Sequence, residues 1–259
     1  VQRTTSLALS AGYYLDSCNE CSLLNCQATS MLSSGTTSSS KAYGFFESGC
    51  SNTRFENCQS INASSYALST GFYTQNSTCS SYISCIANNN VCTGASGTIG
   101  AYGFLVNTGK CISTTFNDCK AYANQGSTDL NGQGCGFSLD NCSYCSIQNG
   151  TAQANSGGNG QGIGIHIGQN AIRCIIINNS VFANTSSLTK KAYGILDKGL
   201  TSSTMLINNL CCNNRDESLV PIDQNYATVY TLNNALQTAA KNNTRNLSSS
   251  LYLNTSITP

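Results

Sequence analysis

Apolar and polar residues recur along this chain in a unit of about thirty residues, from about residue 10 to about residue 214. A glycine followed by an aromatic or aliphatic residue marks each unit, at Gly12-Tyr13, Gly44-Phe45, Gly71-Phe72, Gly103-Phe104, Gly136-Phe137, Gly164-Ile165 and Gly194-Ile195. Successive glycines lie 27 to 33 residues apart. A period of this length is typical of solenoids, in which each unit buries its apolar face against the next unit.

A second recurring stretch in each unit supplies three further columns. The first column is apolar and predicts a core ladder, at Leu23, Phe55, Tyr82, Phe116, Ile147, Ile177 and Ile207. The second predicts an asparagine ladder, at Asn25, Asn57, Asn149, Asn179 and Asn209, with Ser84 and Asp118 in the other two units. The third begins with cysteines that we expect inside the core, at Cys26, Cys58, Cys85 and Cys119.

The character of these columns switches from apolar to polar within two positions, and no helical periodicity persists in any unit, so the pattern predicts short β-strands. Strands of successive units are expected to stack in register about 4.8 Å apart, which places like residues over like residues. Asparagine side chains in such a ladder can bond to the coils above and below them.

Two segments, residues 12–28 and 136–149, resemble right-handed parallel β-helix repeats of the pectate-lyase-like type. The resemblance covers roughly residues 6–214 and implies an all-β, single-stranded, right-handed parallel β-helix of about seven coils. We therefore expect a solenoid over residues 1–214 and a non-repeat C-terminal tail over 215–259. The architecture carries polysaccharide lyases and hydrolases, adhesins, tailspikes and non-catalytic surface proteins, so the resemblance bears on fold rather than on activity.

The chain contains sixteen cysteines, whose spacing follows the repeat. Buried thiol ladders are the favoured interpretation, and disulfides between coils or at turns are the alternative. The pairs Cys18-x-x-Cys21 and Cys142-x-x-Cys145 could each supply half of a zinc site, but they fall on the first and fifth coils. We therefore expect no metal and no other cofactor.

The acidic residues do not form the paired carboxylates that glycosidic chemistry requires. Asp16 and Glu47 fall on adjacent coils, but no third group accompanies them. A weaker candidate group lies near the C-terminal end, at Asp197, Asp216, Glu217 and Asp223. We expect isolated acids to be solvated and the lone His166 to serve in packing. No catalytic residue is assigned, and we do not expect an enzyme.

Charged residues make up only 9% of the chain, and twelve basic residues nearly cancel eleven acidic ones. Ordinary soluble domains contain roughly 25% charged residues. No basic stripe is present that could bind a phosphate backbone, which argues against nucleic acid as a partner. No apolar run reaches the length of a membrane-spanning helix, so we expect no membrane span.

The residue two positions after each glycine predicts an outward-facing contact stripe, because strand alternation places it opposite the inward aromatic column. The stripe contains Tyr14, Phe46, Tyr73, Leu105 and Leu196. The alternative is a wide turn that buries both positions.

The N-terminal edge of the solenoid is expected to lack a cap, because only about ten residues precede Gly12 and residues 4–10 are typical of a strand. Either another copy stacks on this edge or a partner segment adds a strand to it. The tail, residues 215–259, is expected to cover the contact stripe of its own rod or of a neighbour, with a disordered tail as the alternative.

These observations favour a non-catalytic structural β-helix that self-assembles head-to-tail into an extracellular filament or surface layer. A carbohydrate-active or carbohydrate-binding β-helix is the alternative, in which Tyr14 and Tyr73 would stack on sugars. The expected partners are further copies of the chain and, in the alternative, glycans. The expected location is outside the cell or on its surface.

Overall fold

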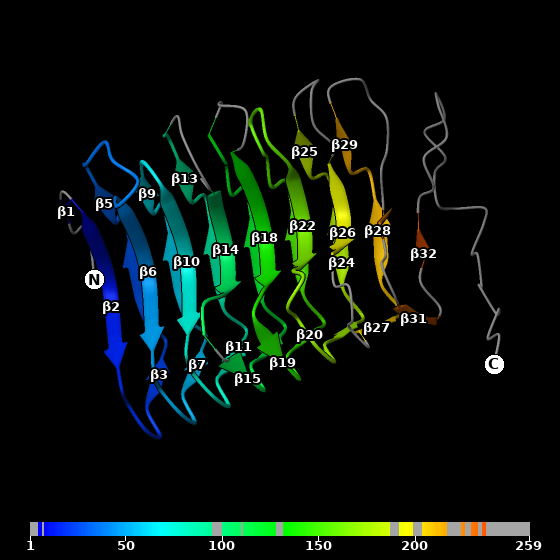
Figure 1. Cartoon of the computed structure of the whole chain (residues 1–259), viewed down its shortest axis with the longest axis horizontal. Helices are drawn as coiled ribbons and strands as arrows, with labels where there is room; N and C mark the ends of the chain where they lie inside the picture. Colours follow the sequence, from blue (N-terminus) through cyan, green and yellow to red (C-terminus); the bar gives the residue numbers. More distant parts are fainter. Residues whose placement is uncertain are drawn as a thin grey trace.

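The computed structural model describes residues 5–6, 8–94, 100–109, 111–127, 132–186, 192–198, 204–216, 224–225, 229–232 and 235–236. All regular structure in these residues is β-strand, and every recorded strand pair is parallel. Figure 1 shows the strands stacked side by side along one axis from the N-terminal end. The predicted all-β parallel solenoid is therefore confirmed.

Three sheets of eight strands run the length of the rod. The glycine sheet contains β2 (Leu9–Asp16), β6 (Lys41–Ser48), β10 (Leu68–Gln75), β14 (Gly100–Val106), β18 (Gln133–Leu139), β22 (Gly162–Ile167), β26 (Tyr193–Asp197) and β30 (Gln224–Asn225). The second sheet contains β3 (Ser22–Leu24), β7 (Arg54–Glu56), β11 (Ser81–Ile83), β16 (Thr115–Asn117), β20 (Ser146–Gln148), β23 (Ile175–Ile177), β27 (Thr204–Ile207) and β31 (Val229–Leu232). The third sheet contains β4 (Gln27–Thr29), β8 (Gln59–Ile61), β12 (Ile86–Asn88), β17 (Lys120–Tyr122), β21 (Thr151–Gln153), β24 (Ser180–Phe182), β28 (Leu210–Cys212) and β32 (Ala235–Leu236).

Shorter strands complete each coil. A fourth sheet contains β1 (Thr5–Ser6), β5 (Leu32–Ser33), β9 (Ser64–Ser65) and β13 (Val91–Cys92). Two further pairs join β15 (Cys111–Ile112) to β19 (Cys142–Ser143) and β25 (Thr185–Ser186) to β29 (Arg215–Asp216).

The solenoid makes about six turns from the first glycine-led strand, β2, to the seventh, β26. The ladders continue past residue 214, because β30, β31 and β32 pair with β26, β27 and β28. These three strands lie within the range predicted as a tail. In the described residues, each of the three long sheets therefore ends in a strand from the same final rung.

The turn from the second to the third sheet uses one left-handed residue in each coil. This column contains Asn25, Asn57, Ser84, Asp118, Asn149, Asn178 and Asn208, with φ between 51° and 57°. Asparagine and aspartate tolerate this conformation because their short polar side chains can bond locally. The recurring asparagine thus marks a sharp turn of the backbone.

Stacked rings fill the core between the glycine sheet and the second sheet. Tyr13, Phe45, Phe72, Phe104 and Phe137 stack at 4.6 to 4.8 Å between ring centroids. A second column, Phe55, Tyr82 and Phe116, meets the first edge to face at 5.4 to 6.3 Å. Each buried ring contributes roughly 1.5–3 kcal/mol by burial, and such pairs add about 0.5–1.5 kcal/mol.

The glycine column lets the third sheet approach the glycine sheet closely. A Cβ atom built on Gly103 would lie 2.7 Å from the Cβ of Ala121 and 2.6 Å from the carbonyl oxygen of Gly136. Both distances are too short for any side chain. The repeat therefore retains glycine here because backbone and small side chains occupy the space.

In the sixth and seventh coils, the observed strand register places the predicted columns one residue earlier in the sequence. Ile147 pairs with Ile176, and Ile176 pairs with Leu206. Ile176 and Leu206 are fully buried, whereas Ile177 and Ile207 lie on the outer face and are partly exposed. The prediction failed because each of these coils contains two consecutive asparagines, and alignment from the sequence chose the wrong one as the turn residue.

Candidate functional site

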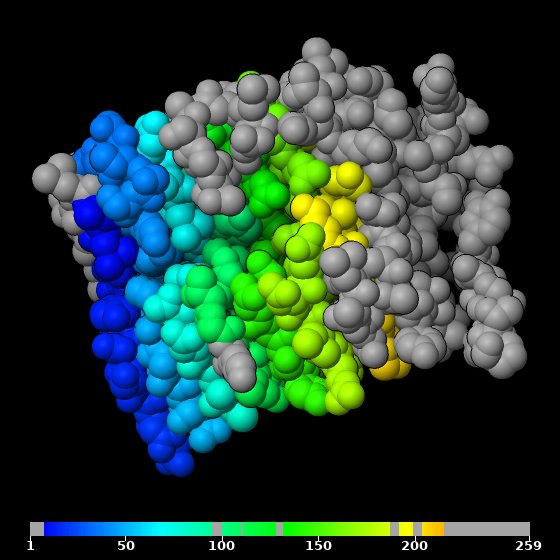
Figure 2. All heavy atoms as spheres, viewed as in Figure 1, coloured from blue at the N-terminus to red at the C-terminus, as the bar shows by residue number. Residues whose placement is uncertain are grey.

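The first coil forms one end of the described rod. Its strands β2, β3 and β4 are the terminal members of the three long sheets, so each pairs with a strand on one side only in the described residues. Figure 2 shows this coil, in blue, at one end of the molecule. The outer edges of these strands carry backbone groups that another strand could pair with.

The inward side chains of the first coil form an end face that is apolar and half-buried. We call this set the end face: Tyr13, Cys18, Cys21, Leu23 and Cys26. The equivalent side chains of the second coil are at most 2% exposed: Phe45, Cys50, Thr53, Phe55 and Cys58. The difference arises because the second coil is covered on both sides. Addition of one further rung would bury the end face in the same way.

The rim of this end is also apolar. Leu9, Tyr14 and Leu24 are 45%, 56% and 54% exposed. Asp16 and Glu20 are the acidic residues of the coil, and both are exposed. The first coil therefore presents an apolar face with little charge, together with strand edges.

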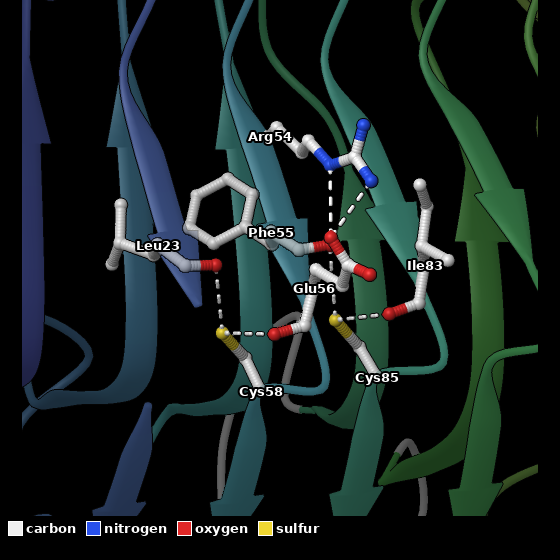
Figure 3. A network of polar contacts seen from close by, with 7 residues as sticks. All are labelled: Leu23, Arg54, Phe55, Glu56, Cys58, Ile83 and Cys85. Atoms are coloured by element: carbon white, nitrogen blue, oxygen red, sulfur yellow. Dashed lines mark hydrogen bonds and ion pairs between the residues drawn. The ribbon is translucent and has the colours of Figure 1, made fainter. Parts of the chain in front are cut away.

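A thiol ladder lies directly behind the end face. The Cys58 thiol donates to the carbonyl oxygens of Leu23 (3.3 Å) and Glu56 (3.5 Å), as Figure 3 shows. The Cys85 thiol repeats this arrangement one coil along, with Phe55 and Ile83. The hydrogen bond with Cys119, together with burial, raises the pKa of Cys85 to about 12. These thiols stay protonated and fill the core, and they are poor nucleophiles.

All sixteen cysteines lie in the described part of the chain, and all are free thiols. This agrees with the thiol-ladder interpretation rather than with disulfides between coils. The closest recorded pair of sulfurs, Cys142 and Cys174, is separated by 3.9 Å. The described residues contain no group of three or more His, Cys, Asp or Glu side chains arranged to hold a metal ion.

A buried asparagine ladder runs along the core and was missed by the sequence analysis. It contains Asn90, Asn124, Asn155, Asn184 and Asn214, all 0% exposed. Each amide nitrogen donates to the side-chain oxygen of the next asparagine at 2.7 to 2.8 Å. The signal was present in the sequence for Asn90 and Asn124, which follow Cys85 and Cys119 of the third column by five positions. On the first two coils, Met31 and Ala63 occupy the positions that asparagines occupy in the later coils.

The predicted asparagine ladder is divided between two columns. Asn25, Asn57 and Asn149 occupy the left-handed turn, as noted above. Asn179 and Asn209 instead occupy the buried column that begins with cysteines, where the amide of Asn179 donates to Asn209 at 2.9 Å. The core of the last coils is thus held by amide bonds at a position where the first coils use thiols.

Glu47 is fully buried, so the expectation that isolated acids are solvated is wrong at this position. Its column faces inward, beside Leu15 and Thr74 in the neighbouring strands. Tyr82 donates to one carboxyl oxygen at 2.9 Å and Ser80 to the other at 2.8 Å. Burial raises the pKa of Glu47 although these hydrogen bonds oppose the shift. With no exposed surface, this carboxyl cannot reach a substrate.

Among the described residues, the acids of the predicted candidate groups do not converge. Asp16 is exposed on the first coil, and Asp197, 2% exposed, lies on β26 at the far end of the glycine sheet. The side chain of Asp216 and both Glu217 and Asp223 lie outside the described residues.

His166 contacts Ser138 in the neighbouring strand, with 3.1 Å between His166 Nδ1 and Ser138 Oγ. This contact was not predicted, although both residues stand in the same column. Burial and the charge of Lys198 lower the pKa of His166 to about 3, so the ring is neutral. Ser138 is only 3% exposed, which leaves no access for a substrate at its hydroxyl. This pair is a packing contact, as expected for His166.

The predicted contact stripe is mostly covered within the chain. Phe46, Tyr73, Leu105 and Leu196 are 8% exposed or less, and Tyr14 alone is exposed. Tyr43 lies against Phe46 at 4.9 Å and against Tyr73 at 5.1 Å between ring centroids. Tyr43 precedes the glycine, and Phe46 follows it by two positions. They meet on one face because the glycine interrupts strand alternation.

No helix in the described part of the chain is long and apolar enough to cross a membrane. Comparison with models of known protein families, with curated proteins and with solved structures found no match.

Proposed function

We propose that this protein is a non-catalytic structural β-solenoid whose copies stack end to end into a filament or surface layer outside the cell. The half-buried end face carries this proposal, because it has the composition of the core and belongs to the outermost rung of the described residues. In finer detail, we propose a right-handed, pectate-lyase-like β-helix in which assembly has replaced catalysis.

The stacking contact would join the first rung of one copy to the last rung of another. The first rung offers β2, β3 and β4, and the last offers β30, β31 and β32, one strand from each of the same three sheets. Pairing these strands would satisfy backbone groups along both edges. Because the two surfaces differ, the contact is heterologous, and it generates an open filament unless rotation closes a ring.

Burial of the end face supplies the apolar contribution. Complete burial of a large apolar side chain contributes roughly 1.5–3 kcal/mol, and Tyr13 and Leu23, which are already partly buried, would each gain up to about a third of that. A ring placed on Tyr13 would also extend the stack that Tyr13 forms with Phe45 at 4.7 Å. The low charge of the chain offers little repulsion against such association.

The titratable groups support a structural role. Glu47 is held inside the fold by the hydroxyl groups of Ser80 and Tyr82, the partly buried His166 contacts the hydroxyl of Ser138, and the thiols serve as ladder residues. The observations do not favour the carbohydrate alternative, since Tyr73 is only 6% exposed and leaves Tyr14 without its predicted companion.

Negative-stain microscopy and analytical ultracentrifugation at neutral pH test this proposal. We expect uniform fibres for the native protein and dispersed short rods for Leu23→Lys, which places a charge on the end face. Tyr144→Glu is the matched control, because Tyr144 is 53% exposed on a middle coil. A native protein that stays monomeric over a wide concentration range, or fibres that persist in Leu23→Lys, would contradict the proposal.

A further inference from the structure

Apolar residues gather on the outer face of the second sheet, and beside it, toward the C-terminal end. We call the following residues of the sixth and seventh coils the flank patch: Ile175, Ile177, Met205 and Ile207 on the second sheet, Ile172 just before it, and Leu210 at the start of β28 in the third sheet. Ile172, Ile175, Met205 and Leu210 are 37% to 41% exposed, and the other two are partly exposed. Ile175 pairs with Met205 and Ile177 with Ile207, so their side chains form one continuous surface.

The same register positions on the preceding coil are all polar. Ser143, Ser146 and Gln148 lie opposite Ile172, Ile175 and Ile177. On the second coil the corresponding strand contains Arg54 and Glu56, which form an ion pair at 2.7 Å. Single apolar residues stand at these register positions on earlier coils, at Leu24, Ile83 and Ile112. Among the described residues, only the sixth and seventh coils place several of them together.

The apolar positions continue into the final rung. Met205 pairs with Tyr230, Ile207 with Leu232 and Leu210 with Ala235. Three successive rungs thus place apolar residues at these register positions. Single exposed apolar residues are ordinary, but contiguous apolar surface on a soluble protein usually marks a contact.

We propose that the C-terminal segment, residues 237–259 of the same chain, docks on the flank patch. The segment follows β32 directly, and β32 pairs with β28 on the sheet adjoining the patch. It contains five large apolar residues: Leu247, Leu251, Tyr252, Leu253 and Ile257. Its only charged side chains are Lys241 and Arg245, so an extended segment could cover the patch without burying an acid.

Geometry favours this occupant over a second copy. An extended chain spans about 3.3 Å per residue, so 23 residues reach well beyond two coils about 4.8 Å apart. Leu251 and Leu253 are two positions apart, and on an extended segment they point to the same side, as Ile175 and Ile177 do on β23. Docking within the chain also explains why the apolar positions become contiguous where the segment can reach them.

Site-specific photocross-linking locates the occupant. A benzophenone amino acid replaces Met205 in the whole chain, with Thr115 as the control because it lies in the same column on a coil outside the flank patch. The experiment is performed on dilute monomer with an equal mixture of ¹⁴N- and ¹⁵N-labelled chains. We expect cross-links from position 205 to residues 237–259 of the same isotopic label, and few from position 115. Mixed-label cross-links, or cross-links to any other region, would overturn the proposal in favour of a second copy or another contact.

Dye binding provides an independent measurement. Leu251→Asp combined with Leu253→Asp should release the segment and raise the fluorescence of an apolar-surface dye several-fold. The charge-matched control is Ser248→Asp combined with Ser250→Asp. These two residues have the same spacing, and on an extended strand they would point to the side opposite Leu251 and Leu253. Equal fluorescence in the two double variants would overturn the proposal. Because both measurements use monomer, the outcome is independent of whether the end face assembles.

Discussion

Replacement of Asn124 by alanine tests whether the buried asparagine ladder holds the coils together. Asn124 accepts from the Asn90 amide at 2.7 Å and donates to Asn155 at 2.7 Å. Its oxygen also accepts from the Asn90 backbone N–H at 3.4 Å. Because Asn124 is 0% exposed, alanine would remove these bonds and leave a buried cavity.

The magnitude follows from the polar groups that remain without this partner. An unsatisfied buried donor or acceptor costs roughly 1–3 kcal/mol. Three groups are affected. The Asn90 backbone N–H loses its bond to Asn124, whereas the Asn90 amide keeps a bond to Tyr102 O at 3.1 Å and the Asn155 oxygen keeps the Asn124 backbone N–H at 3.3 Å. These residual bonds lower the cost, whereas the cavity raises it. We expect a loss of about 2–4 kcal/mol in the free energy of unfolding.

Urea denaturation followed by circular dichroism measures this loss, with dilute protein so that assembly does not contribute. Asn117→Ala is the matched control, because Asn117 lies in an exposed asparagine ladder and accepts one bond from Asn149 at 3.0 Å. We expect the control to cost no more than about 0.5 kcal/mol. Equal losses in the two variants would refute the reasoning, since burial would then not matter to these amide bonds.

Three further predictions concern single side chains. Burial raises the pKa of Glu47 above its ordinary value of 4.5, so the folded state binds more protons than the unfolded state above that pH. The stability of the fold should therefore fall as pH rises above about 4.5. Glu47→Gln should flatten this dependence of the melting temperature on pH. The pKa of His166 is lowered from 6.5 to about 3, so stability should fall as pH decreases through that interval. His166→Leu should remove this acid-side loss, and an unchanged profile would contradict the assignment. Gly103→Ala should cost about 1–3 kcal/mol in urea denaturation, because its Cβ would overlap Ala121 and the Gly136 carbonyl; an alanine variant as stable as the native protein would contradict this.

The sequence alone determined the architecture of this protein. Glycine-led strands recur at a nearly constant period, and apolar positions return in the same order, so that only parallel stacking places each unit's apolar face against the next one. The aromatic column from Tyr13 to Phe137 was predicted on this basis, and the register pairs its residues as expected. Cys58, Cys85 and Cys119 of the predicted cysteine column are fully buried. Periodicity succeeds here because strand alternation and coil spacing are local properties of the backbone.

The tertiary structure decided which of several equivalent residues faces the core. Each left-handed turn residue redirects the chain, so the choice between Asn178 and Asn179 reverses the side on which Ile176 and Ile177 lie. In the same way, the glycine of each coil interrupts alternation and turns a predicted outer stripe into a packed cluster around Tyr43. Burial of Glu47 and of the Asn90 to Asn214 ladder depends on neighbouring coils about thirty residues away. A single strand carries no information about what covers it, because burial is decided by the coils packed on either side.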